Sequence, residues 1–332
     1  MRGWAVSSNT GGPGRLVSIE RDQPTPGSFE VLVSVEVCGI CRTDLHLADG
    51  DLPPRAGLRI PGHEVVGDVV ALGAEASRFV VGDRVGIAWL RSTCGVCSAC
   101  RRGGENLCRS ATFTGWDADG GYAQYAVVHE GYAYALPAQS PAASLAPLLC
   151  SGIIGYRALK RAQLSPGGRL GIYGFGASAH LTAQLAIAQG HEVHVLTRGQ
   201  SARSLALELG AASAGDAADA PPVPLDGAVL FAPAGELVPV ALAALDQGGT
   251  LALAGIHLSD IPGLDYQRHL FRERTVTSVT ANTRADGEEF LRLANAVGIS
   301  PRVTTYGFDE ADRALDDLAK GVATGAAVLN VR

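Results

Sequence analysis

The spacing of apolar residues divides the chain into a strand-rich first part and an alternating second part. Apolar and polar residues alternate over 31–37, and runs rich in β-branched or aromatic residues, bounded by glycine, cover 64–71 and 122–128. Alternation with a period of two is typical of half-buried strands. We therefore expect short strands and turns over the first third of the chain.

From about residue 144 the pattern changes to helices alternating with strands. Strands are expected at 170–173, 192–196, 228–231 and 250–254. One helix is expected to follow the first strand and to end at residue 189, and two others are expected at 201–209 and 238–245. This alternation predicts βαβ units and a parallel sheet. Residues 214–224 lack periodicity and are expected to form a surface loop. Residues 308–321 are expected to form a last helix, with acids early and Lys320 late.

Composition narrows the class of protein. The chain has 332 residues, of which 47% are hydrophobic and 18% charged, and a net charge of −6 without an acidic or basic block. This pattern argues against binding to nucleic acid or to a membrane surface. No apolar run reaches the roughly 18 residues that a membrane span requires. We expect a cytoplasmic protein of two domains with reduced thiols.

Four cysteines lie close together in the first part of the chain. Cys94, Cys97, Cys100 and Cys108 are separated by two, two and seven residues. Thiolates at this density are the usual ligands of a closed, tetrahedral structural zinc site. Two disulfides are the alternative, but they are more natural in a small secreted domain. A closed site would fix a loop and perform no chemistry.

Further potential metal ligands are scattered along the chain. Cys38 and Cys41 are followed by His63 and, much later, by Cys150. Cys38 and Cys41 are also compatible with a redox pair, and Cys150 with a packed apolar thiol. Two sulfurs, one imidazole and a vacant position are typical of a catalytic zinc site. Calcium and magnesium prefer oxygen ligands instead.

A glycine motif indicates nucleotide binding. Gly174, Gly176 and Ala179 give the pattern G-x-G-x-x-A between a predicted strand and a predicted helix. This spacing lets the backbone approach a pyrophosphate at a helix N-terminus. About 20 residues on, Thr197 and Arg198 replace the acid that usually binds the ribose of NAD, which favours NADP over NAD. Alternatively, Arg198 stacks on the adenine or faces solvent.

Together and in this order, these motifs resemble those of the zinc-dependent medium-chain alcohol dehydrogenases. The motifs are Cys41-Arg-Thr-Asp44, Gly62-His-Glu-x-x-Gly67, the four-cysteine loop and the glycine motif. The resemblance implies an α/β protein with two domains. It places a mostly β, GroES-like catalytic domain at 1–145 and 287–332, and a Rossmann domain with a doubly wound parallel sheet at 146–286. The active site is expected in the cleft between them.

The resemblance also implies roles for individual residues. It makes Cys41, His63 and Cys150 the ligands of a catalytic zinc, Asp44 the acid that orients the imidazole, Glu64 a carboxylate near the metal, Thr43 and His46 a proton relay, and Arg42 a pyrophosphate contact. Trp89, Leu90 and Trp116 are expected as pocket walls, with ordinary core packing as the alternative. Each chain would then hold two zinc ions and one NAD(P)(H).

The expected reaction is reversible hydride transfer between a small alcohol and a nicotinamide cofactor, with an aldehyde or ketone as the other substrate. The alternatives are a formaldehyde or polyol dehydrogenase of the same fold, and a silent zinc-stabilised nucleotide-binding protein. Family precedent implies a homo-oligomer, either a tetramer or a dimer. Alanine occupies 326 and 327, where many members carry an arginine directed at the cofactor, so Arg42 or Arg284 is expected to supply that charge.

Overall fold

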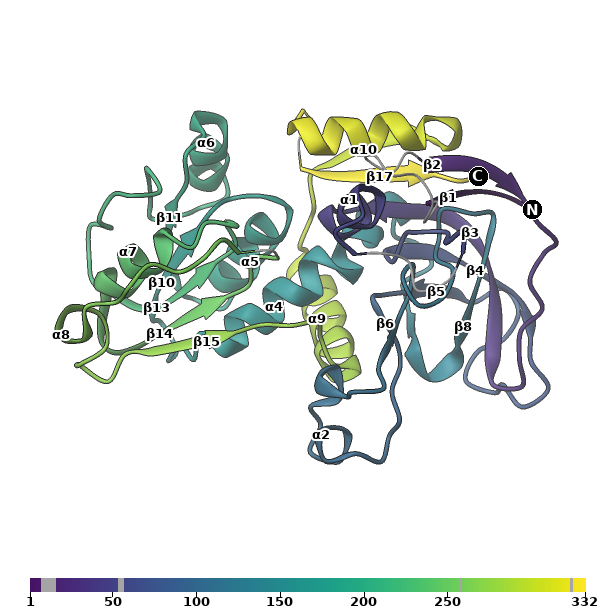
Figure 1. Cartoon of the computed structure of the whole chain (residues 1–332), viewed down its shortest axis with the longest axis horizontal. Coiled ribbons are helices and arrows are strands. Elements are labelled where there is room, and N and C mark those ends of the chain that lie inside the picture. Colours follow the sequence, from purple (N-terminus) through teal and green to yellow (C-terminus); the bar gives the residue numbers. More distant parts are fainter. Residues whose placement is uncertain (7–15, 53–56, 257, 323–324) are drawn as a thin grey trace. The chain divides into compact units, whose positions relative to one another are not determined.

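The computed structural model describes residues 1–6, 16–52, 57–256, 258–322 and 325–332. The chain forms two compact units (Figure 1). The first unit holds Met1–Cys150, Ala281–Glu288 and Pro301–Arg332, and the second holds Ser151–Thr280 and Glu289–Ser300. The first segment of the first unit therefore ends at Cys150, whereas the sequence predicted a boundary at 145. Residues 289–300 belong to the second unit.

The first unit is mostly β-structure. Its strands are β1 (Arg2–Val6), β2 (Leu16–Glu20), β3 (Glu30–Ile40), β4 (Val65–Leu72), β5 (Arg84–Ile87), β6 (Leu90–Ser92), β7 (Thr112–Phe113), β8 (Tyr125–His129), β9 (Ala133–Ala135), β16 (Val303–Gly307) and β17 (Ala326–Asn330). The main sheet has the order β16-β17-β3-β4-β5-β9, and β8 also pairs with β3. β1 pairs with β2, and β6 with β7.

Short helices connect these strands. They are α1 (Arg42–Asp49), α2 (Ser98–Arg101), η1 (Glu105–Leu107), η2 (Glu130–Tyr132), α3 (Ala142–Leu145), η3 (Ala146–Leu149), η4 (Phe308–Glu310) and α10 (Ala311–Lys320). The helix expected at 308–321 is thus confirmed, with a first turn of 3-10 type. A further helix, α9 (Arg284–Val297), begins in the first unit and continues into the second.

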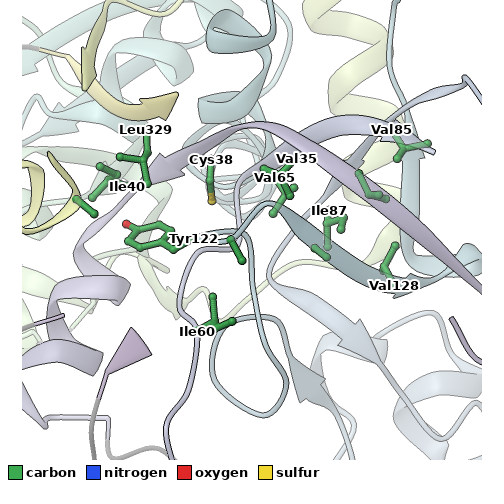
Figure 2. Packing of buried hydrophobic residues seen from close by; sticks show 14 of the residues in the cluster. Val35, Cys38, Ile40, Ile60, Val65, Val85, Ile87, Tyr122, Val128 and Leu329 are labelled. Atoms are coloured by element: carbon green, nitrogen blue, oxygen red, sulfur yellow. The ribbon is translucent and has the colours of Figure 1, made fainter. Parts of the chain in front are cut away.

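Strand β3 organises the first unit. It pairs antiparallel with β4, β8 and β17. Five of its residues, Val31, Val33, Val35, Cys38 and Ile40, are buried in one apolar cluster (Figure 2). Cys38 of β3 lies opposite Val65 of β4, and the amide of Gly39 donates to the carbonyl of Glu64 at 2.9 Å. The end of β3 and the start of β4 therefore lie side by side. This pairing brings the segment after Ile40 next to the segment before Val65.

The second unit contains a six-stranded parallel sheet of order β12-β11-β10-β13-β14-β15. The strands are β10 (Arg169–Tyr173), β11 (Glu192–Leu196), β12 (Ser213–Gly215), β13 (Leu225–Leu230), β14 (Leu245–Leu253) and β15 (Thr275–Ser278). The helices are α4 (Ser151–Arg161), α5 (Ala177–Ala188), α6 (Gln200–Glu208), α7 (Leu237–Ala244) and α8 (Tyr266–His269). The order, with β10 central and the chain winding outward to both sides, is that of a doubly wound fold.

The structure corrects one expectation and confirms several. The predicted loop at 214–224 begins inside β12, because a three-residue edge strand is too short to produce a pattern. The strands and helices expected between 170 and 254 are present near their predicted ends, except that β14 begins at Leu245, five residues before the predicted start. Among the described residues, no single helix has the length and apolar character needed to cross a membrane. One bent pair, 142–149 and 151–161, passes that test by length and composition alone.

Candidate active site

Three of the expected ligands converge in the first unit. The Nε2 atom of His63 lies 3.3 Å from the Sγ atom of Cys41 and 3.3 Å from the Sγ atom of Cys150. Together with a carboxylate oxygen of Glu64, these ligand atoms all lie within 4.8 Å of one another. Two sulfurs and an imidazole at this spacing fit a divalent metal such as zinc. Cys38 is not a member of this cluster.

The position of Cys41 follows from how α1 begins. Cys41 is the N-cap residue, and its Sγ atom accepts a hydrogen bond from the amide of Thr43 at 3.2 Å. In return, the Asp44 carboxylate accepts from the amide of Cys41 at 2.9 Å, which completes a capping box. The Cys41-x-x-Asp44 spacing therefore fixes both side chains through a local helix cap.

The imidazole of His63 is almost fully buried and faces the Asp44 carboxylate. Its Nδ1 atom lies 3.6 Å from Asp44 Oδ1 and has no partner within hydrogen-bonding distance among the described residues. Burial alone would lower the pKa of His63, but Cys41 and Asp44 raise it well above its ordinary value. Burial also raises the pKa of Asp44. A bound cation would supply the positive charge that these groups otherwise obtain from protons.

The two thiols of the cluster differ in the direction of their pKa shifts. A hydrogen bond from Cys150 is the main reason that the pKa of Cys41 falls well below its ordinary value, and the same bond raises the pKa of Cys150. Burial raises the pKa of Glu64, which contacts β3 at Gly39. A side chain at Gly39 would clash with the Glu64 carboxylate. Glycine at that position therefore admits the carboxylate to the cluster.

Aromatic rings line one side of His63. The ring of Trp89 meets the imidazole edge-on, with 4.9 Å between the ring centroids. It also stacks on the ring of Trp116, with 6.1 Å between the centroids. Phe113 stacks on Trp89 at 4.9 Å and was not anticipated from the sequence, because a single aromatic residue in a strand gives no signal. Leu90 is buried in the core. Trp89, Phe113 and Trp116 are half-buried, whereas Leu90 agrees with the core-packing alternative.

The two residues expected in a proton relay occupy successive turns of α1. Thr43 is buried in the first turn, and His46 lies in the last. The Nδ1 atom of His46 is 2.8 Å from the Asp51 carboxylate, a contact that the sequence did not indicate. The left-handed residue Gly50 ends the helix and turns the chain back, and the amide of Leu52 donates to the carbonyl of His46 at 3.1 Å.

The four-cysteine cluster forms a second metal-binding geometry. All four cysteines are free, with Cys97 and Cys100 sulfurs 3.5 Å apart and Cys94 and Cys108 sulfurs also 3.5 Å apart. The disulfide alternative is therefore absent from the structure. Backbone hydrogen bonds lower the pKa of Cys94 to about 6, and desolvation raises the pKa of Cys100 to about 11. The lowered pKa favours the thiolate form of Cys94, which is the form that binds a metal.

The glycine motif lies in the second unit between β10 and α5. Gly174 has a φ of 84°, and a side chain there would approach the backbone of Ala232. Gly176 is the N-cap residue of α5, makes no side-chain cap, and has open space where a Cβ would be. Ala179 is fully buried in the first turn of α5. The loop thus leaves room for a phosphate group at the start of a 12-residue helix.

Two arginines lie near the end of β11, Arg198 just after the strand and Arg203 in α6. Thr197 is buried, whereas Arg198 is exposed. The guanidinium of Arg203 donates to the carbonyl of Thr197 at 3.0 Å and lies 3.2 Å from the Asp216 carboxylate. Arg203 was not anticipated from the sequence, because it belongs to the following helix. It braces the strand end from which Arg198 projects.

The other candidate phosphate contacts have different surroundings. Arg42 is exposed at the start of α1. Arg284 instead forms an ion pair with Glu105 at 2.8 Å, and its guanidinium lies 4.6 Å from the ring centre of Tyr132. The alanines at 326 and 327 lie buried in β17. Arg284 is therefore engaged with the loop that carries the four cysteines.

Comparison with known proteins decides the family. The model of the alcohol dehydrogenase GroES-like domain matches residues 27–138. The chain is 59% identical to a probable alcohol dehydrogenase, AdhA, of Mycobacterium tuberculosis, over 95% of this chain and 93% of that one. The chain belongs to the zinc-dependent medium-chain alcohol dehydrogenase family. An alcohol dehydrogenase of Geobacillus stearothermophilus is 34% identical over 94% of this chain and 95% of its own length.

Solved structures agree with this membership. A thermostable alcohol dehydrogenase from Pyrobaculum aerophilum, solved with cobalt and zinc bound, has a TM-score of 0.87 and 27% identity, with 99% of both chains covered. CAD from Helicobacter pylori, complexed with NADP(H), has a TM-score of 0.89 and 26% identity, with 99% of this chain and 97% of that chain covered. This chain therefore has the expected GroES-like and Rossmann fold, and its relatives include alcohol dehydrogenases.

Proposed function

We propose that this alcohol dehydrogenase interconverts small alcohols with aldehydes or ketones by using one catalytic zinc and NADP. Cys41, His63 and Cys150 would hold the catalytic zinc, with Glu64 beside it, and the four-cysteine loop would hold a structural zinc. The convergence of two thiols on one buried imidazole carries the proposal, since each contact is 3.3 Å long. This donor set matches catalytic zinc sites that leave one position for substrate.

The side chains of α1 would manage the proton. When bound, zinc supplies a Lewis acid to the substrate oxygen, and the nicotinamide supplies or accepts the hydride. The hydroxyl of Thr43 accepts the proton of the substrate alcohol and donates its own proton onward. His46 passes a proton to solvent, and its Nδ1 atom is held at 2.8 Å by Asp51. Such positioned acid–base groups contribute roughly 10²–10⁴-fold to a rate.

The second unit would bind the cofactor. The pyrophosphate would lie at Gly174, Gly176 and Ala179, where α5 begins without a side-chain cap. Arg42 would add a charged contact to the pyrophosphate. Thr197 and Arg198 would receive the 2′-phosphate, which favours NADP over NAD. A cytoplasmic location and a homo-oligomer, either a dimer or a tetramer, are proposed on family precedent alone.

A substrate panel tests the proposed reaction. Purified enzyme would be assayed with primary, secondary and aromatic alcohols, each with NAD and with NADP. We expect cofactor reduction with at least one alcohol class, and faster reduction with NADP. If no alcohol, aldehyde or ketone were turned over by the metal-loaded enzyme, the silent zinc-stabilised alternative would replace this proposal. Turnover of formaldehyde adducts or polyols alone would favour the other alternative.

Replacing Arg198 with alanine should weaken NADP selectively. A hydrogen bond to a charged group is worth about 1.5–3 kcal/mol, so the preference for NADP over NAD should fall about tenfold or more. Binding of 2′,5′-ADP and of 5′-AMP, measured by calorimetry, would check this without turnover. Arg272→Ala removes another exposed arginine of the second unit and serves as the control. Equal affinities for 2′,5′-ADP in wild type and Arg198→Ala would contradict the assignment.

Replacing Cys100 with serine should lower the thermal stability of the first unit without removing a residue of the proposed catalytic site. A closed four-thiolate site contributes folding free energy, because the metal binds only the folded loop. The thermal midpoint of Cys100→Ser should fall by several degrees and one metal per chain should be lost. Calorimetry together with elemental analysis would measure both. A variant that melted like wild type with both metals retained would exclude a structural role for the cluster.

A further inference from the structure

A buried tyrosine lies behind the proposed catalytic metal site. Tyr122 has no exposed surface and lies in the apolar core of the first unit, with Cys38 and Ile60 nearby (Figure 2). Its hydroxyl donates to the Oδ2 atom of Asp44 at 3.3 Å. A phenol hydroxyl in such a core requires a partner, and the carboxylate supplies it.

The Asp44 carboxylate is held from several sides. Its Oδ1 atom accepts from the amide of Gly62 at 3.0 Å, and its Oδ2 atom accepts from the amide of Cys41 at 2.9 Å. Both amides belong to segments that carry proposed metal ligands, since Gly62 precedes His63. The hydroxyl of Tyr122 is a side-chain donor to this fully buried carboxylate. The carboxylate therefore links both ligand segments to the tyrosine.

The ring of Tyr122 also shapes the loop before His63. Gly62 has a φ of 96°, and any side chain there would clash with the ring of Tyr122. The amide of Tyr122 donates to the carbonyl of Pro61 at 3.0 Å, and the amide of Trp4 donates to the carbonyl of Tyr122 at 2.8 Å. The tyrosine is thus fixed at its backbone, ring and hydroxyl, all beside the same loop.

We propose that Tyr122 is a positioning residue for the metal site, because it fixes the Asp44 carboxylate, whose Oδ1 atom lies 3.6 Å from the Nδ1 atom of His63. The inference rests on the proposed function, in which His63 is a ligand through Nε2. A proton on Nδ1 directed at Asp44 leaves the Nε2 lone pair for the metal. Without the hydroxyl, the carboxylate loses one of its restraints and the imidazole is oriented less tightly.

Tyr122→Phe tests this inference, because it removes one oxygen and keeps the ring that fills the core. Holoenzyme would be dialysed against graded chelator and its zinc content measured, which gives one loss step for each metal. The step that is missing in Cys41→Ser identifies the site of Cys41, His63 and Cys150. Loss of a group that supports a ligand weakens metal binding roughly 10–100-fold. We expect about a tenfold shift of that step in Tyr122→Phe, with kcat reduced and KM for the alcohol little changed.

Two comparisons separate positioning from general stability. Tyr306→Phe removes another tyrosine–aspartate hydrogen bond of the same unit, 3.1 Å long between Tyr306 and Asp317, and should leave both metal steps unchanged. In an Asp44→Asn background, Tyr122→Phe should add no further loss of metal affinity, since the two residues act in series. An unshifted metal step in Tyr122→Phe, or additive losses in the double variant, would overturn the inference alone. Retention of both steps in Cys41→Ser would instead overturn the proposed metal site, and the inference with it.

Discussion

Replacing Cys41 with serine should abolish turnover and remove one of two metals per chain while the fold is retained. The thiol is one of two sulfurs that lie 3.3 Å from the Nε2 atom of His63, and serine is a poor ligand for zinc. A Lewis-acid metal supplies several kcal/mol to the transition state, so a loss of about 10³-fold or more in kcat is expected. Elemental analysis, circular dichroism and steady-state kinetics would measure metal content, fold and rate.

Cys38→Ala is the matched control for this experiment. Cys38 is a buried thiol three positions earlier, at the end of β3, and it is not part of the ligand cluster. The control should keep two metals and measurable turnover, although a small cavity will lower its stability. Two retained metals and wild-type activity in Cys41→Ser would show that the catalytic metal is elsewhere or absent.

Replacing Thr43 with alanine should reduce turnover by roughly 10²–10⁴-fold while both metals stay bound. The hydroxyl is the proposed proton acceptor for the substrate, and no metal ligand is removed. The amide of Thr43, which donates to Cys41 at 3.2 Å, is unaffected by the change. Single-turnover kinetics and elemental analysis would establish the rate and the metal content.

Thr43→Ser keeps a hydroxyl at the same place and is the matched control. It should retain most of the activity, because the serine oxygen can accept and donate the same hydrogen bonds. A Thr43→Ala enzyme as fast as Thr43→Ser would remove the threonine from proton transfer. In that outcome the substrate proton must leave by another path, for which His46→Gln would be the next variant to measure.

Local sequence predicted the parts of the site that depend on one turn of chain. The glycine motif is a strand–turn–helix connection, so it is visible as a short pattern. The four-cysteine loop is also visible as a short pattern, because its four thiols lie within 15 consecutive residues. The Cys41-x-x-Asp44 spacing forms a helix cap in the structure, but the sequence assigned a role to Asp44 only through resemblance to a family. What joins Cys150 to His63, 87 positions away, is strand pairing and packing. The sequence indicated that contact only through resemblance to a family.

Residues that act through tertiary contact left no signal in the sequence. Tyr122 reads as one aromatic residue in a β-rich stretch, and only the structure brings its hydroxyl to Asp44. Arg203 lies in a helix after the ribose position, and Asp51 follows the end of α1. The edge strand β15 is mostly exposed and rich in threonine and serine, so burial gives it no apolar pattern. The three-dimensional structure was needed to find these three contacts and this strand.

The most direct test of the account is the location of zinc in crystals of the wild-type enzyme grown with NADP. An anomalous difference map at the zinc absorption edge should contain two peaks per chain. One peak should lie among Cys41, His63 and Cys150, and the other among the four cysteines that include Cys94 and Cys108. A map of fully metallated, active enzyme with no peak at Cys41, His63 and Cys150 would contradict the account.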